Sequence, residues 1–398
     1  EFNMKQKVED FIKKIKEKNM KQKIGMIVLA LFFVGLGSMT TWLFYNQAIG
    51  KFNSDLILHI SSAISSSGSQ YTITKPIYKF IYMYFGGNLG IAVFLSIVVI
   101  LTIILTKKLL DYYTATPKES STKNWIYAFL LNFAIAIFIP FIHKGWNAGV
   151  QEANEWHNST YICMKLLGLG IMLLYFKMSK KYLSKIETKD YILFVILLLL
   201  VNLIKPNFII AFAPAMLVYL IIDFFKNIKN KKAIINIIIF GCAVLISLSV
   251  LVYQAKVLYG VDDGSGIKIG FMTLLKAYHE YPVISLIQSI AFPLFILTIN
   301  IKKIAKDRKY SFVWIMNTVA LLEYLCLEET GARALDGNFD WGYSFTLMMT
   351  FISSVALFEN TKNDKTKIYT ALGYLLLALH IASGIAYFAR LMLGYTFA

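Results

Sequence analysis

Asp55 and His59 are the residues of this sequence whose types and spacing point most directly to chemistry. They lie four residues apart in segment 53–64, where apolar residues recur at helical spacing, so both side chains are expected on one helix face. This carboxylate has two interpretations. In the first, Asp55 stabilises the amino-terminal end of a helix through the backbone dipole, with Ser54 as the cap. In the second, Asp55 is a general base that takes the proton from an attacking hydroxyl group.

Asp336, Asn338 and Asp340 form a second group with ligand-like spacing. They match the first three ligand positions of an EF-hand loop, but no glycine follows Asp340, and Leu347 stands where the bidentate glutamate belongs. The segment is therefore not an EF-hand. It is either a turn in which the carboxylates bond to local backbone, or a looser site for Mg²⁺ or Mn²⁺. We predict no metal site with a defined ligand set, and Mg²⁺ or Mn²⁺ is the one cofactor left open.

The composition indicates which kind of fold positions these residues. Of the 398 residues, 57% are apolar and only 16% are charged, whereas soluble domains have about 45–50% apolar and about 25% charged residues. The apolar residues form blocks of about 20, the length that spans the hydrocarbon core of a bilayer. The sequence therefore predicts an all-α polytopic membrane protein. The net charge of +17 lies mainly between the blocks, which indicates membrane topology and not nucleic-acid binding.

Eleven apolar blocks are expected to span the membrane. They lie at about 24–46, 87–106, 125–143, 159–177, 191–204, 207–225, 233–254, 283–300, 310–328, 343–358 and 368–390. Residues 24–398 thus form a single membrane domain. Residues 1–23 are expected to form a cytoplasmic interfacial helix, because an apolar stripe at helical spacing runs through its lysines. Residues 1–3 precede the first methionine, Met4, and are expected to be a cloning remnant.

Positive charge predicts the sides of the membrane. Most of the 40 Lys and Arg residues fall in alternate connecting segments, which places these segments and the N-terminus in the cytoplasm. The outer loops are then at about 47–86, 144–158, 255–282 and 329–342. Lys205 and Pro206 interrupt a long apolar stretch and are predicted to form a tight outer turn. If they were a kink within one span, later lysine-rich segments would lie outside, against the charge distribution.

The first outer loop is predicted to contain two short helices at the membrane surface. One is segment 53–64, and the other begins at Pro76, with Lys79 on its polar face. The sequence resembles the type C (GT-C) glycosyltransferase superfamily. The resemblance lies in this loop, in the cytoplasmic N-terminus, in the eleven spans and in an acidic residue early in the loop, within Ser54-Asp55-Leu56-Ile57-Leu58-His59. The resemblance implies sugar transfer from a polyprenyl-phosphate or polyprenyl-diphosphate carrier on the outer face, with Asp55 as the catalytic base. Many members have two acids in this loop, whereas Asp55 is the only one here.

A lipid-phosphate donor requires cations near its leaving group, because negative charge develops on the phosphate oxygen as the glycosidic bond breaks. Arg333 is the first candidate, since guanidinium can hold phosphate through two hydrogen bonds. Lys205 and Lys79 are the next candidates. The alternative for these residues is snorkelling from a helix end to the lipid headgroups.

Polar and aromatic residues of the outer loops are candidates for binding the sugar or the acceptor. They are His59, Glu152, Glu155, Trp156, His157, Asp336, Asp340 and Trp341. The alternative for the tryptophans is that they anchor the protein at the membrane interface. Two charged residues fall within spans, Lys165 and Glu323. Because buried ions need partners, we expect either that they pair with each other or that Lys165 serves the donor phosphate.

Together these features predict a membrane glycosyltransferase that moves a sugar from a polyprenyl-phosphate carrier to a cell-envelope glycan or lipid acceptor, with inversion implied by the resemblance. One alternative is a polysaccharide polymerase or ligase that uses a lipid-diphosphate donor. Another is a flippase or transporter of lipid-linked sugars, which would usually show repeated halves and mid-membrane charges.

The many Ile, Lys and Asn residues are typical of an AT-rich bacterial genome, so a bacterial plasma membrane is the expected location. Expected partners are the donor, the acceptor and membrane lipids, with no nucleic acid.

Overall fold

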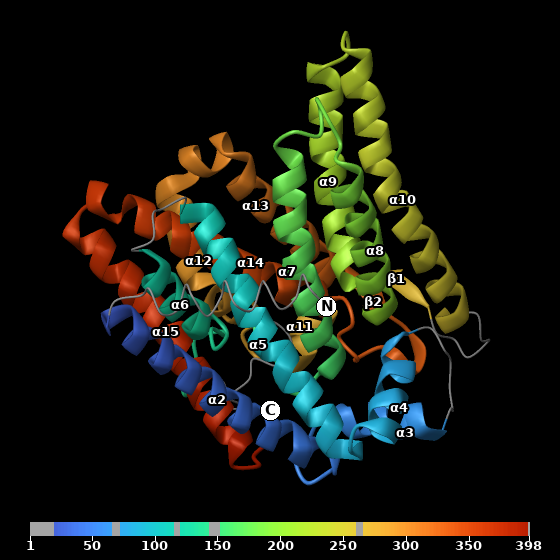
Figure 1. Cartoon of the computed structure of the whole chain (residues 1–398), viewed down its shortest axis with the longest axis vertical. Helices are drawn as coiled ribbons and strands as arrows, with labels where there is room; N and C mark the ends of the chain where they lie inside the picture. The colour runs from blue at the N-terminus through green and yellow to red at the C-terminus, as the bar shows by residue number, and fades with distance from the viewer. Residues whose placement is uncertain (1–19, 66–71, 115–119, 143–151, 260–265, 397–398) are drawn as a thin grey trace.

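The computed structural model describes residues 20–65, 72–114, 120–142, 152–259 and 266–396 (Figure 1). In chain order the helices are α2 (Met20–Ala48), α3 (Leu56–Ser65), α4 (Thr74–Tyr84), α5 (Gly87–Thr114), α6 (Ser120–Leu131), α7 (Ser159–Ser179), α8 (Thr188–Ile204), α9 (Asn207–Lys226), α10 (Lys231–Tyr259), α11 (Thr273–Tyr278), α12 (Pro282–Lys306), α13 (Arg308–Cys326), α14 (Asp340–Thr361) and α15 (Lys367–Met392), with the 3-10 turns η1 (Gly331–Arg333) and η2 (Lys362–Asp364). Most of the predicted N-terminal interfacial helix and part of the second outer loop fall outside the described residues.

Eight of the described helices are long and apolar enough to cross a membrane: α2, α5, α7, α9, α10, α12, α14 and α15. The fold is therefore that of an all-α polytopic membrane protein, as the composition predicts. Helix α8 has 17 residues and α6 has 12, while α13, with 19, is less apolar. The break predicted at Lys205 and Pro206 is present, because α8 ends just before it and α9 begins just after it.

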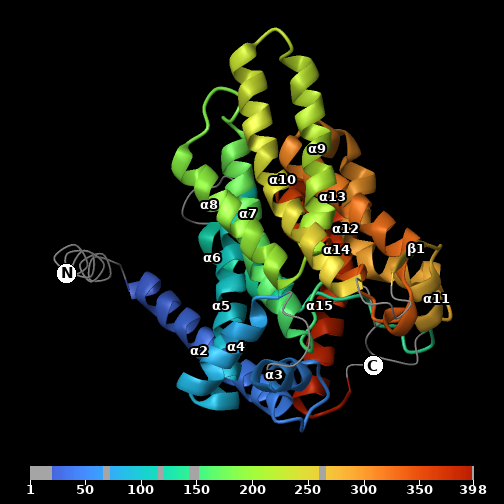
Figure 2. The same cartoon turned by 90° about the vertical axis from the view of Figure 1, so that its right-hand side faces the viewer.

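Helix α14 lies inside the bundle, where it contacts α5, α9, α12 and α13 (Figures 1 and 2). Its membrane-length segment is entirely buried. Hydroxyl side chains can be buried here because they bond to the helix itself: Thr346 Oγ1 donates to the Tyr343 carbonyl at 2.9 Å and Thr350 Oγ1 to the Leu347 carbonyl at 2.7 Å. Since α14 begins at Asp340, its packing fixes the position of that carboxylate.

The apolar stretch 125–143, predicted as one span, is helical only up to Leu131, and residues 134–139 form neither helix nor strand. Buried backbone groups need partners, and distant residues supply them. Two of these amides bond to α15: the Ile135 amide donates to the His380 carbonyl and the Phe138 amide to Ser383 Oγ. The Ala136 amide donates to Glu152 Oε2, and the Ile137 amide donates to the Gln288 carbonyl of α12. Helices α12 and α15 therefore replace the helical hydrogen bonds that this stretch lacks.

Gly384 of α15 lies directly against this non-helical stretch. A Cβ at position 384 would come within 1.4 Å of the Phe133 carbonyl oxygen. We expect Gly384→Ala to lower the free energy of unfolding by about 1–3 kcal/mol, because relief of the clash must move backbone. Thermal unfolding of the purified protein in detergent measures this change. Gly35→Ala in α2 is the control, since a Cβ there meets nothing within 4 Å; equal losses in the two variants would contradict the prediction.

Connecting segments lie at both ends of the helix bundle. At one end, Lys309 Nζ donates to the Tyr113 carbonyl of α5 at 3.2 Å, and Lys123 of α6 pairs with Glu359 of α14. Helices α3 and α4 lie at the opposite end of the molecule from the α9–α10 connection (Figures 1 and 2). The loop before α7 is joined by hydrogen bonds to Ser54 and Asp55, which immediately precede α3.

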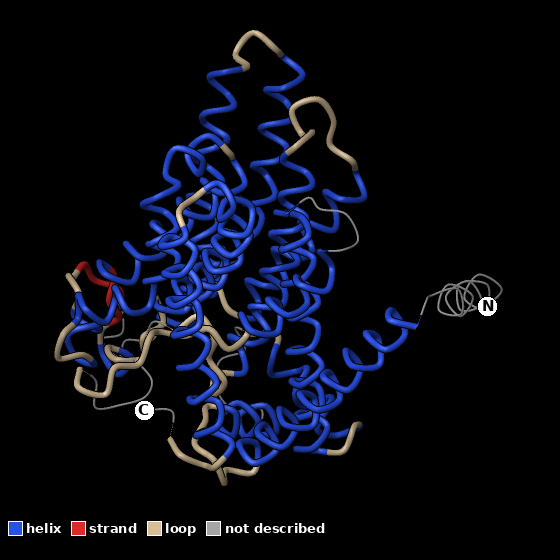
Figure 3. Tube along the Cα trace, turned by 90° about the vertical axis from the view of Figure 1, so that its left-hand side faces the viewer, coloured by secondary structure: helices blue, strands red, loops and turns tan. Residues whose placement is uncertain are grey.

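Two short strands join the predicted outer loop 255–282 to the end of the predicted span 310–328, a feature that the sequence did not predict. Strand β1 (Ile267–Ile269) pairs antiparallel with β2 (Leu327–Glu329), with Ile267 opposite Glu329 (Figure 3). The bond from the Thr330 amide to the Gly266 carbonyl, 2.9 Å long, extends the pairing. The pairing with β1 therefore holds in place the beginning of the segment after β2, which contains Arg333.

Candidate functional site

Asp55 lies one residue before α3 and faces the loop that precedes α7. Ser54 Oγ caps α3 by accepting from the Leu56 amide at 3.1 Å, and it donates to the His157 carbonyl at 2.6 Å. Asp55 Oδ2 instead accepts from Asn158 Nδ2 at 3.0 Å. The capping role thus belongs to Ser54, and the Asp55 carboxylate is directed towards a different loop.

His157 forms a buried pair with Glu155 beside Asp55. Its side chain is 6% exposed, and its Nδ1 lies 2.9 Å from Glu155 Oε2. Burial alone would lower the pKa of His157, but the Glu155 carboxylate, with a smaller contribution from Asp55, raises the pKa above its ordinary value. The pair therefore favours a protonated imidazole next to Asp55.

We expect Glu155→Gln to lower the pKa of His157, because burial would then act without the nearby carboxylate. The measurement is an NMR titration of histidine-labelled protein in nanodiscs, with the His157 signal assigned by its loss in His157→Gln. The other histidine signals of the same spectra are the control. A titration midpoint of His157 that does not move would contradict the role given to Glu155.

Lys205 contributes a cation to the same site. It follows α8, and its Nζ lies 3.5 Å from Thr160 Oγ1 and 4.5 Å from the centroid of the Trp341 ring. Burial lowers the pKa of Lys205 to about 8, although the negative charge of Asp55 opposes this shift, and Arg333 also acts on it electrostatically. Asp55 and two cations therefore lie within electrostatic range of one another.

Arg333 is held by Glu329, a residue that the sequence reasoning did not select. Arg333 Nε lies 3.0 Å from Glu329 Oε1, and Asn338 Nδ2 donates to Glu329 Oε2 at 2.5 Å. Glu329 is itself 4% exposed and ends strand β2. The four-residue spacing of Glu329 and Arg333 was the one signal for this pair, and it is a weak one outside a helix.

His59 interacts electrostatically with Asp55 and Lys205. Burial lowers the pKa of His59, and the charge of Lys205 lowers it further, against the effect of Asp55. Lys75 is the cation of α4 that acts on His59, while Lys79 is exposed.

Asp336, Asn338 and Asp340 do not converge. The Asp336 side chain is half-exposed and lies 3.8 Å from Arg333 Nε, whereas Asp340 is buried, with Oδ2 accepting from Ser344 Oγ at 3.3 Å. Within the described parts of the chain, no three His, Cys, Asp or Glu side chains are placed to hold a metal ion. Trp341, next to Asp340, faces Lys205 as described above, so this segment contributes an aromatic ring to the site.

Glu152 and Trp156 are buried in the protein core. Glu152 is 0% exposed, and it accepts from the Ala136 amide at 2.7 Å. Trp156 is 3% exposed and packs on Phe388, with ring centroids 4.8 Å apart. Both residues hold the loop before α7 against the non-helical stretch 134–139, and neither presents a surface to a ligand in this structure.

The expected pairing of Lys165 with Glu323 is wrong. Lys165 Nζ donates to Asn154 Oδ1 at 2.8 Å, and Asn154 Nδ2 donates in turn to the carbonyls of Leu131 and Ala134, each at 2.8 Å. A neutral amide from the loop before α7 thus satisfies the buried ammonium group. This contact was not predictable from spacing, because the loop folds inward onto α7.

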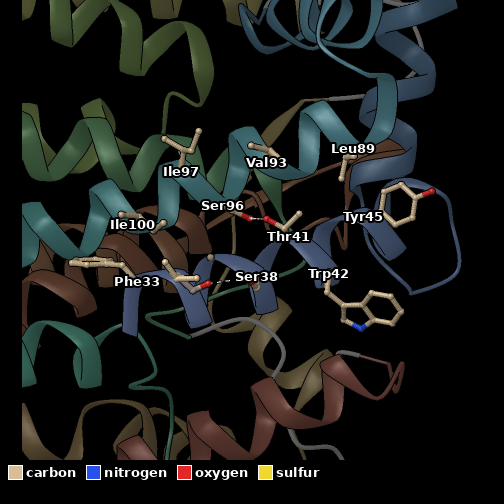
Figure 4. A pocket seen from close by; sticks show the side chains of 12 residues that line it. Phe33, Ser38, Thr41, Trp42, Tyr45, Leu89, Val93, Ser96, Ile97 and Ile100 are labelled. Carbon is tan, nitrogen blue, oxygen red and sulfur yellow. Dashed lines mark hydrogen bonds between the residues drawn. The ribbon is translucent and has the colours of Figure 1, made fainter. Parts of the chain in front are cut away.

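A groove of about 660 Å³ lies between α2 and α5, away from Asp55 (Figure 4). Its lining is mainly apolar, and the Thr41 and Ser96 hydroxyls in it bond to each other at 2.9 Å. Such a surface suits a hydrocarbon chain and offers no acid or base for catalysis.

The geometry therefore brings together residues from five segments of the chain: Asp55 and His59, Glu155 and His157, Lys205, Arg333 with Asp336, and Asp340 with Trp341. This arrangement can remove a proton from a hydroxyl group and stabilise negative charge beside it. No protein-family model matches the chain, and no curated protein matches its sequence.

Proposed function

We propose that this protein is an integral membrane glycosyltransferase that transfers a sugar from a polyprenyl-phosphate carrier to a glycan or lipid acceptor of the cell envelope. The observation that carries the proposal is the grouping of one carboxylate, Asp55, with two cations, Lys205 and Arg333, beside the short helix α3. A carboxylate alone would suit many sites. Its combination with cations for a phosphate leaving group, in a membrane protein, favours a lipid-phosphate donor.

In the proposed reaction, an acceptor hydroxyl attacks the anomeric carbon from the side opposite the phosphate. The new bond joins the acceptor oxygen to that carbon, and the bond from the carbon to the phosphate oxygen breaks. The phosphate oxygen leaves with the bonding electron pair, and Asp55 takes the hydroxyl proton. Lys205 and Arg333 stabilise the charge on the departing polyprenyl phosphate. Attack from the opposite side inverts the configuration of the sugar.

The sugar and acceptor subsites are assigned by their position around Asp55. His157, held by Glu155, and His59 both interact electrostatically with this carboxylate. The Trp341 ring lies against Lys205 and is 9% exposed. These side chains can bond to hydroxyl groups or stack on a sugar ring, and Asp336 and Asp340 lie at the edge of the same group.

The proposed topology has eleven crossings and a cytoplasmic N-terminus. Helices α8 and α13 would add to the eight long helices, and α6 with the non-helical stretch after it would form the remaining crossing. Helices α3 and α4 would lie at the outer membrane surface, because their apolar side chains Leu58, Phe80, Met83 and Tyr84 are exposed. The site would then face the outer side, where lipid-linked sugars are presented, in a bacterial plasma membrane.

The test is sugar transfer by the purified protein in proteoliposomes. Polyprenyl-monophosphate and polyprenyl-diphosphate sugars with labelled sugar groups are offered with envelope acceptors, and liposomes without protein are the control. Label transferred one sugar at a time from the monophosphate donor supports the proposal. Products that grow by whole repeat units from a diphosphate donor would instead identify a polymerase or ligase. Movement of the labelled lipid across the bilayer without transfer would identify a transporter.

A further inference from the structure

Asn158 connects the candidate base to the start of α7 through the two ends of one side-chain amide. Its Oδ1 accepts from the Tyr161 amide at 2.9 Å, which makes Asn158 the cap of α7. The same oxygen accepts from Thr160 Oγ1 at 2.8 Å. Because both bonds need the oxygen to face α7, Nδ2 must point the other way, towards Asp55 Oδ2, where the distance is 3.0 Å.

The network continues from Asn158 to the cation of the site. Thr160 Oγ1, which donates to Asn158, lies 3.5 Å from Lys205 Nζ. Asn158 and Thr160 are both 5% exposed, so water has little access to compete for these bonds. The hydrogen-bonded path therefore runs from Lys205 through Thr160 and Asn158 to Asp55, and it joins three separate segments of the chain.

We propose that Asn158 is a positioning residue that holds the Asp55 carboxylate in one orientation relative to Lys205. This inference rests on the proposed function, because it assigns Asn158 to the transfer reaction through Asp55. With Oδ2 held by Asn158, Asp55 Oδ1 is the oxygen that receives the proton of the acceptor hydroxyl.

The cap and the positioning contact can be separated by substitution. Asn158→Ser keeps a good helix cap but cannot reach Asp55 as a donor. We expect it to lower kcat for transfer by about 10- to 100-fold, because a poorly oriented base loses the attack geometry, while the donor KM stays unchanged. The matched control is Asn230→Ser, since Asn230 caps α10 by accepting from the Ala233 amide at 3.2 Å, far from the site. This control should transfer sugar at the wild-type rate.

Asn158→Asp gives a second readout that a structural role would not produce. It keeps the cap but brings a second carboxylate to Asp55, and two like charges at this separation favour a shared proton. The acidic limb of the transfer rate should then move to higher pH. The double variant Asp55→Asn/Asn158→Ser should transfer no more slowly than Asp55→Asn alone, because Asn158 acts through Asp55.

A fourth measurement does not depend on the identity of the reaction. Thermal unfolding of Asp55→Ala, Asn158→Ser and the double variant should show non-additive changes, because the two single changes remove the same hydrogen bond. Additive changes would overturn the inference even if no donor is found. If the wild type transfers sugar and Asn158→Ser keeps the wild-type kcat, the inference fails while the proposed function stands. Absence of transfer by the wild type with non-additive unfolding would refute the proposed function, and with it the part of Asn158 in transfer, while the Asn158–Asp55 contact would stand.

Discussion

Asp55→Asn is expected to reduce sugar transfer by about 10²- to 10⁴-fold at an unchanged amount of folded protein, the range that general-base catalysis usually contributes. Asparagine keeps the size of the side chain, and its oxygen can still accept from Asn158, so the contact at 3.0 Å has a substitute. It cannot take up the proton of the acceptor hydroxyl. The rate of label transfer in proteoliposomes, normalised to folded protein, measures the effect.

The control for this variant is Asp364→Asn, which changes an exposed aspartate of η2 at the α14–α15 connection. It makes the same chemical change where no part of the site lies and should leave transfer unchanged. If Asp55→Asn retains the wild-type rate, Asp55 is not the base, and its carboxylate has a structural role at the start of α3.

Lys205→Met should weaken transfer from the phosphate donor by about 10²- to 10³-fold, the effect of removing one group that stabilises developing negative charge. Arginine at the same position keeps the charge and should retain most of the activity. The comparison of donor KM and kcat for Lys205→Met and Lys205→Arg measures the contribution of the charge. Lys256→Met, at an exposed position near the end of α10, is the matched control.

The pH dependence of transfer gives an independent check on Lys205. Burial lowers its pKa to about 8, so the ammonium group is charged below that pH and loses its proton as the pH rises through it. Wild-type transfer should therefore fall above pH 8, through a fall in kcat, because the ammonium charge stabilises the departing phosphate. In Lys205→Arg this fall should disappear, because guanidinium keeps its charge throughout the range. An alkaline limb that is the same in both proteins would show that another group causes it.

The parts of the fold set by local sequence were predictable. Hydropathy gave the long helices, and Lys205 with Pro206 marked the break between α8 and α9, because proline restricts the backbone before it. Asp55 was predicted from its position early in the first outer loop, and Arg333 and Lys205 were predicted because a phosphate leaving group requires cations. The structure brings these three into one electrostatic neighbourhood.

Features that depend on distant contacts could not be predicted. The end of α6 at Leu131 is not marked by proline or glycine, and the partners of the residues after it lie in α12, α15 and the loop before α7. Strands β1 and β2 have three residues each, too few for a periodic pattern. Asn158 was not among the candidate residues, and only the folded structure shows that its amide joins α7 to Asp55.

The non-helical stretch after α6 also constrains the order in which the chain matures during biosynthesis. The Phe138 amide bonds to Ser383 Oγ, a residue that leaves the ribosome 245 positions later. Until α15 is synthesised, the Ile135 and Phe138 amides lack their partners His380 and Ser383, and an unsatisfied amide in apolar surroundings is costly. Completion of α15, near the end of translation, is therefore needed for the final conformation of this stretch.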